Sequence, residues 1–160
     1  MLILLLKLNS MAIYTDIIGE LATAIDGMTI AGGYNYNYGP ADVFDPASRV
    51  YPQVFIRFPE EVGREPEEEV VNQYVADSEV EFEVIIDDTE STADEMMDNV
   101  VEDFKRLLEA DHDTLQTKGL IVADYLDNVR EYTHVRERPG KVTITFNLNY
   151  RVKRSNPSVT

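Results

Sequence analysis

The amino-acid sequence predicts an α+β fold in which two helices pack on one face of a mostly antiparallel β-sheet. Two segments, 14–28 and 97–108, repeat apolar residues at three- and four-residue steps, which is the pattern of an amphipathic helix. Two others, 80–86 and 142–152, alternate apolar and polar residues, which is typical of strands with one buried face. The order of one helix, several strands, a second helix and two final strands is that of an α+β sandwich.

The chain has 160 residues, the size of one domain, and 44% of them are hydrophobic, which is enough to form a core. We expect a single domain over residues 11–154, a flexible C-terminal tail over 155–160 and an N-terminal extension over 1–10. The apolar run Leu2–Leu6 is too short to span a bilayer and lacks the flanks of a signal peptide. It is an extra strand or tail, unless Met11 is the natural start and the residues before it are not native.

In the first half of the chain, a helix is expected to begin at a cap, Ser10 or Thr15, and to end at Gly27. The next segment, "GGYNYNYG", places its tyrosines two residues apart. We interpret it as an amphipathic strand, half buried in the core or in an interface. Another strand follows at about 53–58, and the glutamate-rich segment 60–69 is predicted to be an exposed, mobile loop.

In the second half, residues 70–87 are predicted to form a long strand with apolar residues on one face and glutamates on the other. The second helix begins with a capping box, Thr92 and Glu95. After Gly119 the strand pattern is irregular, which indicates bulges. The final strand presents one apolar face, which consists of Val142, Ile144, Phe146, Leu148, Tyr150 and Val152.

The charge of the chain argues against binding to nucleic acid. There are 30 acidic and 14 basic residues, so the formal net charge is -16. Proteins that bind nucleic acid neutralise phosphates with Lys and Arg, whereas this chain would repel a duplex. Stacking of bases on Tyr34, Tyr36 and Tyr38 would usually come with a basic groove. One face of a strand is the better interpretation of these tyrosines.

Few residues of this sequence point to catalysis or to a cofactor. The absence of cysteine excludes a disulfide scaffold, a Cys-ligated zinc site and a thiol nucleophile. His112 and His134 lie in no motif, and "AGGYN" lacks the spacing and the Lys of a phosphate-binding loop. Acidic clusters such as Asp94–Glu95–Asp98 lack EF-hand spacing and suit a helix N-terminus. We expect no catalytic residue, cofactor or metal site, and no enzymatic activity.

Charge is divided unevenly along the chain. Residues 118–160 contain 8 basic and 4 acidic side chains, whereas residues 1–117 contain 6 basic and 26 acidic ones. A subunit polarised in this way can join copies of itself head to tail, and such contacts can close into a ring. The alternative is a solvated acidic protein whose basic edge strand protects it against aggregation. The candidate interface residues are Arg136, Arg138, Lys141, Arg151, Lys153 and Arg154, together with Tyr34, Tyr36 and Tyr38.

Four parts of this layout resemble the phage tail terminator family, whose members complete tails and join them to heads. The amphipathic helix "YTDIIGELATAI" is followed by the strand "YPQVFIRF", which "ADVFDPASR" precedes. A central capped helix, "TADEMMDNVVEDFKRLL", leads to the final hairpin, "EYTHVRERPGKVTITFNLNYRV", and a short polar tail. The resemblance covers residues 11–153 and concerns layout rather than a diagnostic motif.

The resemblance implies a tail-terminator-like fold and a structural virion protein of the phage tail and neck, assembled in the host cytoplasm. Such proteins form a hexameric ring that caps the tail tube, ends tube polymerisation and joins the tail to the neck or head connector. The implied partners are further copies of the chain, the tail tube protein, a neck or head-completion protein and, in contractile tails, the sheath protein. DNA would pass through the lumen without specific binding, and no membrane is involved.

Two other functions fit the same residues. One is a different neck component, such as a head-closure or stopper protein, which the sequence does not separate from a tail terminator. The other is a small acidic enzyme or metal-binding domain. That function would require a convergent pocket of carboxylates whose pKa values are perturbed.

Overall fold

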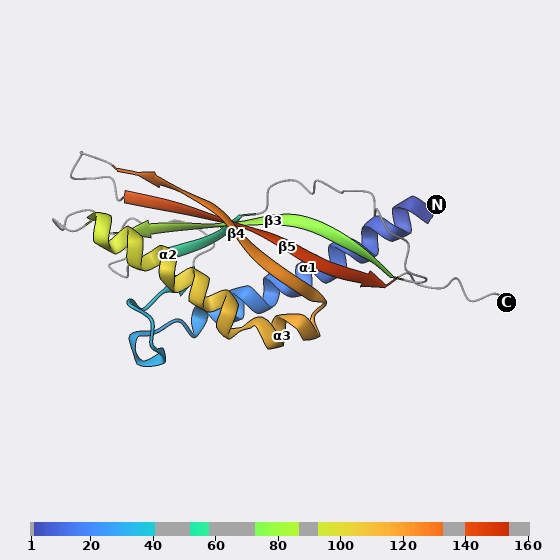
Figure 1. Ribbon diagram of the computed structural model, residues 1–160, viewed down its shortest axis with the longest axis horizontal. Helices are drawn as coiled ribbons and strands as arrows, with labels where there is room; N and C mark the ends of the chain where they lie inside the picture. The colour runs from blue at the N-terminus through green and yellow to red at the C-terminus, as the bar shows by residue number, and fades with distance from the viewer. Residues whose placement is uncertain (1, 41–51, 58–72, 87–92, 133–139, 154–160) are drawn as a thin grey trace.

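The two periodic patterns of the sequence form long, regular helices and strands (Figure 1). The computed structural model describes residues 2–40, 52–57, 73–86, 93–132 and 140–153. Its helices are α1 (Leu2–Asp26), α2 (Ala93–Ala110) and α3 (His112–Thr117), with the short 3-10 helix η1 (Ile30–Gly32). Its strands are β1 (Gly39–Pro40), β2 (Gln53–Arg57), β3 (Gln73–Ile86), β4 (Leu120–Glu131) and β5 (Gly140–Lys153).

The strands of the described residues form one sheet in the order β1-β2-β3-β5-β4. β3 and β5 form its centre and pair antiparallel along their whole length, from Gln73 opposite Lys153 to Ile86 opposite Gly140. β2 and β4 pair antiparallel with their outer sides, and the two-residue β1 runs parallel to β2. The predicted α+β class and the mostly antiparallel sheet are confirmed.

The core lies between the helices and one face of this sheet (Figure 1). On β3, the side chains of Val80, Phe82, Val84 and Ile86 are fully buried, as the two-residue alternation predicts. The apolar stripes of α1 and α2 cover this face, and α3 adds Leu115. The predicted apolar face of β5, from Val142 to Val152, is buried as well. The main apolar faces are therefore those that the sequence indicates.

α1 begins earlier than the sequence predicts. Residues 2–10, for which an extra strand or tail was one expectation, form its first turns, so Ser10 and Thr15 lie inside the helix rather than at its cap. Leu and Lys, which make up most of residues 2–8, favour helix, and no proline precedes Asp26. The predicted end is confirmed, because the chain leaves the helix at Gly27.

The sequence also does not predict α3, which begins at His112 in a short polar segment. Gly119 then turns the chain into β4 with a φ of 107°. A Cβ at this glycine would lie 3.1 Å from Ile13 Cγ2 and 3.3 Å from the carbonyl oxygen of Arg151. The predicted loop 60–69, the cap Thr92 and the tail 155–160 lie outside the described residues.

Candidate functional site: the β4 flank

The tyrosine-rich segment is a loop, so the prediction of a strand there is wrong. Residues 29–38, here called the tyrosine loop, contain η1, and Gly33 has a φ of 92°, which a strand does not accommodate. The side-chain oxygen of Asn37 accepts a hydrogen bond from the backbone N–H of Ile30 at 2.9 Å. Asn37 therefore closes the loop on itself instead of lying on the outer face of a strand.

A buried carboxylate on α2 holds the tyrosine loop. Asp103 is fully buried and accepts hydrogen bonds from Asn35 N at 2.9 Å, Asn35 Nδ2 at 2.8 Å and the Tyr38 hydroxyl at 2.7 Å. Burial, followed by this hydrogen bond, raises the pKa of Tyr38, so the phenol stays protonated and donates. Arg106 adds a hydrogen bond from its guanidinium to the carbonyl of Gly33. These contacts fix the loop against the helix.

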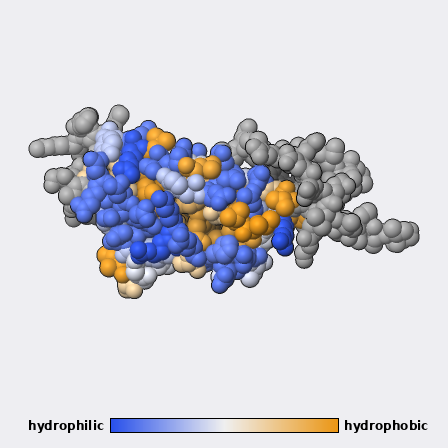
Figure 2. Space-filling view, viewed as in Figure 1, coloured by the Kyte–Doolittle hydropathy of each residue, from blue (hydrophilic) through white to orange (hydrophobic). Residues whose placement is uncertain are grey.

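The tyrosines that were candidates for an interface pack mainly against their own subunit. Tyr38 is buried, and its ring meets that of Phe104 edge-on with centroids 5.6 Å apart. Tyr36 is half-buried, and its hydroxyl accepts a hydrogen bond from Asn99 Nδ2 at 3.4 Å. Tyr34 is half-buried too, and its burial raises the pKa of the phenol. What the loop exposes is its tip at residues 30–33, where Figure 2 shows apolar atoms at the lower left.

β4 is the edge strand whose irregular pattern indicated bulges, and the bulges are confirmed. Its pairing with β5 shifts near its start and again between Tyr125 and Asp127. The second shift leaves Leu126 as the extra residue of a β-bulge. Tyr125 lies on the helix-facing side before the bulge, and Asn128 and Arg130 lie on that side after it, opposite buried residues of β5. The bulge thus selects which side chains face α2.

Beyond this bulge, polar side chains of β4 face the helices and apolar ones face away, which is the reverse of the arrangement on the central strands. Asn128 and Arg130 face the helices, whereas Val129 lies on the other face with 57% of its surface exposed. Leu126, at the bulge, is 47% exposed. Most of the exposed large apolar residues in the described part of the chain lie on β4 or directly after it: Val122, Tyr125, Leu126, Val129 and Tyr132. Such a group along an edge strand is typical of a protein-binding surface.

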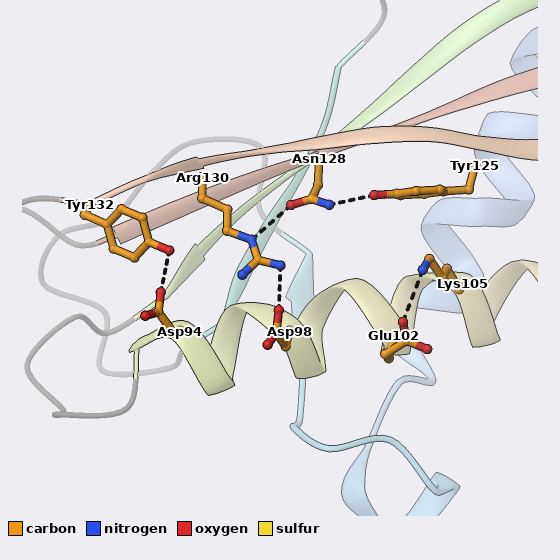
Figure 3. A network of polar contacts seen from close by, with 8 residues as sticks. All are labelled: Asp94, Asp98, Glu102, Lys105, Tyr125, Asn128, Arg130 and Tyr132. Carbon is orange, nitrogen blue, oxygen red and sulfur yellow. Dashed lines mark hydrogen bonds and ion pairs between the residues drawn. The ribbon is translucent and has the colours of Figure 1, made fainter.

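Polar side chains connect the helix-facing side of β4 with α2 (Figure 3). The hydroxyl of Tyr132 donates to Asp94, and Arg130 Nη2 donates to Asp98 Oδ1 at 2.6 Å. Successive partners are two residues apart on β4 and four residues apart on α2. The spacings match because two residues of a strand and four residues of a helix both advance about 6–7 Å. The hydrogen bond to Asp98 raises the pKa of Arg130. The acidic first turns of α2 therefore have partners on β4.

The series of polar contacts between β4 and α2 continues toward the middle of β4 (Figure 3). Asn128 accepts from Arg130 Nε at 3.0 Å and donates to the hydroxyl of Tyr125 at 2.6 Å. The ammonium of Lys105 lies 4.5 Å from the centre of the Tyr125 ring and 3.1 Å from Glu102 Oε1. Exposed ion pairs of this kind each contribute about 0–1 kcal/mol. Their combined effect is to set how β4 lies on α2, which leaves its apolar residues outside.

A hollow of about 480 Å³ lies beside β4, between α2 and the beginning of α3. Leu108, Val122 and Phe146 are among its apolar lining residues, and Lys105 and Glu109 add charged groups of opposite sign. His112 lines it too and is half-buried, whereas His134 lies outside the described residues. We call this hollow and the exposed apolar residues of β4 the β4 flank.

The sheet face turned away from the helices is acidic, and we call it the acidic face. Its described carboxylates outnumber its described basic groups by seven to three. The carboxylates belong to Asp77, Glu79, Glu81, Glu83, Asp124, Asp127 and Glu131, and the basic groups to Arg57, Lys141 and Arg151. Arg57 pairs with Glu83 at 3.1 Å. The face keeps an excess of negative charge after such pairing.

The basic residues that were candidates for an interface are only partly described. The ammonium of Lys141 lies 2.6 Å from Glu131 and 3.8 Å from Glu83, and the hydrogen bond to Glu131 raises its pKa. Lys141 is therefore already paired within its own subunit. Arg151 is exposed near the other end of β5. Outside the described residues lie Arg136, Arg138, Arg154 and the side chain of Lys153.

The described part of the chain gives little support for a metal site, a membrane-spanning helix or a catalytic carboxyl pair. There, no group of three or more His, Asp or Glu side chains is placed to hold a metal ion. Among the helices of that part, none is long and apolar enough to cross a membrane. Burial and the neighbouring Glu20 carboxylate raise the pKa of Asp111 to about 6. This carboxyl pair lies outside the lining of the hollow.

Sequence reasoning did not identify the β4 flank. The irregular alternation after Gly119 was its one signal, and it indicated bulges without showing which side chains they expose. No protein-family model matches the chain, and the comparison with curated proteins gives no match either.

Proposed function

We propose that this chain is the subunit of a ring that caps the phage tail tube, ends tube polymerisation and joins the tail to the neck or head connector. The observation that carries the proposal is the β4 flank, where apolar side chains are exposed along an edge strand. Within the described residues, no further strand pairs with that edge. A free edge of this kind favours contact with another protein chain. The resemblance in layout supports a phage tail as the place of assembly.

The two edges of the sheet differ, which favours head-to-tail assembly. One edge is the 12-residue β4, and the other is the two-residue β1 beside the five-residue β2. A contact between unlike surfaces is repeated by every copy and closes into a ring when the rotation permits. In the proposed ring, the β4 flank of each copy meets a different surface of its neighbour.

The acidic face supports a position around DNA in transit. Carboxylates along the wall of a channel repel the phosphates of a duplex, so the DNA can slide without binding. The ion pairs at Arg57 and Lys141 neutralise only part of this charge. In the proposed ring, the acidic face lines the lumen and the helices lie outside it.

Capping of tail tubes by the purified chain tests the proposal. Tubes incubated with the wild-type chain should carry a ring at their ends in electron micrographs, and elongation should stop when the chain is added. The double variant Leu126→Asp and Val129→Asp should not cap, because it places charges on the apolar edge. Val75→Asp is the matched control, since Val75 is an exposed apolar residue on β3, away from this edge. Circular dichroism should show that all variants fold alike.

Each outcome has a defined meaning. If the wild-type chain does not bind tube ends, the proposed function is wrong. Binding to connector rings but not to tubes would identify the chain as another neck component. Normal capping by the double variant would show that the β4 flank is not the assembly surface.

A further inference from the structure

We draw no further inference here: the strongest candidate, the hollow between β4, α2 and the beginning of α3, carries side chains of both charges, Lys105 and Glu109, and nothing in the structure shows what covers it.

Discussion

Asp103 carries a carboxylate into the interior of the subunit, where donors from the tyrosine loop replace water. Removing a charged group from water is unfavourable unless hydrogen-bond donors surround it. Here the donors are the backbone and side-chain nitrogens of Asn35 and the hydroxyl of Tyr38. These residues lie 68 and 65 positions from Asp103 along the chain. The loop and the middle of α2 therefore become ordered together.

Asp103→Asn should destabilise the fold by about 2–3 kcal/mol, because the new amide would point an N–H group at other donors. Urea unfolding followed by circular dichroism measures this free energy. The exposed neighbour Glu102 supplies the control, and Glu102→Gln should change stability by less than about 0.5 kcal/mol. Equal unfolding midpoints for the two variants would show that Asp103 does not hold the loop.

Asp111 should make the stability depend on pH. Burial and the charge of Glu20 raise its pKa from 3.8 to about 6 in the folded chain, so the folded state binds this proton more tightly than the unfolded state. Its contribution is therefore complete below about pH 4 and is lost as the pH rises through about 6. Asp111→Asn should raise the thermal midpoint at pH 7 and have little effect at pH 4. Asp113→Asn, an exposed neighbour, is the control, and a pH-independent Asp111→Asn effect would contradict this account.

At the scale of single elements, the regular strands and α2 were predictable because their information is local. From Val80 to Val84 on β3 and from Val142 to Val152 on β5, one polar residue separates each buried residue from the next, so the sequence alone shows the face that meets the core. The stripe of α2 from Met97 to Leu108 shows its buried side in the same way. These patterns need no knowledge of a distant partner.

The tyrosine loop and β4 were not predictable in this way because their partners are distant. The spacing of Tyr34 and Tyr38 imitates a strand, and only Asp103 on α2 explains why the chain bends there. On β4, Arg130 faces inward because Asp98, 32 positions earlier, receives its guanidinium. The sequence of β4 therefore shows irregularity but not the exposed surface that follows from it.

Deleting Leu126 should be tolerated, because a bulge residue is extra to the pairing on both sides. The residues beyond it would keep their faces, and we expect a loss of less than about 1 kcal/mol. Deleting Asn128 is the matched control. It would turn Arg130 and Tyr132 away from α2 and place Val129 toward it, since a one-residue shift exchanges the two faces. The thermal unfolding midpoint should fall much more on deletion of Asn128 than on deletion of Leu126. Equal losses of stability would contradict the assignment of Leu126 as a bulge residue.

At the scale of the whole molecule, the negative charge is not spread evenly. The acidic face collects carboxylates from β3 and β4, whereas the tip of the tyrosine loop carries no charge. Charged and uncharged surfaces thus belong to different parts of one small subunit. Electrostatic repulsion between two copies would therefore be weaker at the tip than at the acidic face.

The net charge of -16 should also make the folded chain sensitive to salt. Like charges held on a compact surface repel each other, and ions screen this repulsion over about 10 Å at 0.1 M salt. The thermal unfolding midpoint should rise with added sodium chloride, measured by circular dichroism in dilute solution. Sulfate is unsuitable because it strengthens burial in general. A midpoint that falls with sodium chloride would show that attractive ion pairs dominate.

The full-length pairing of β3 with β5 has a mechanical consequence. Both strands are 14 residues long, which corresponds to about 45 Å of extended chain. Their backbone hydrogen bonds run perpendicular to the strands. A pull along the strands strains all of these bonds together in shear, whereas a pull across them would open the bonds one after another. A subunit oriented with these strands along an axis of tension would resist the pull with the whole length of this strand pair.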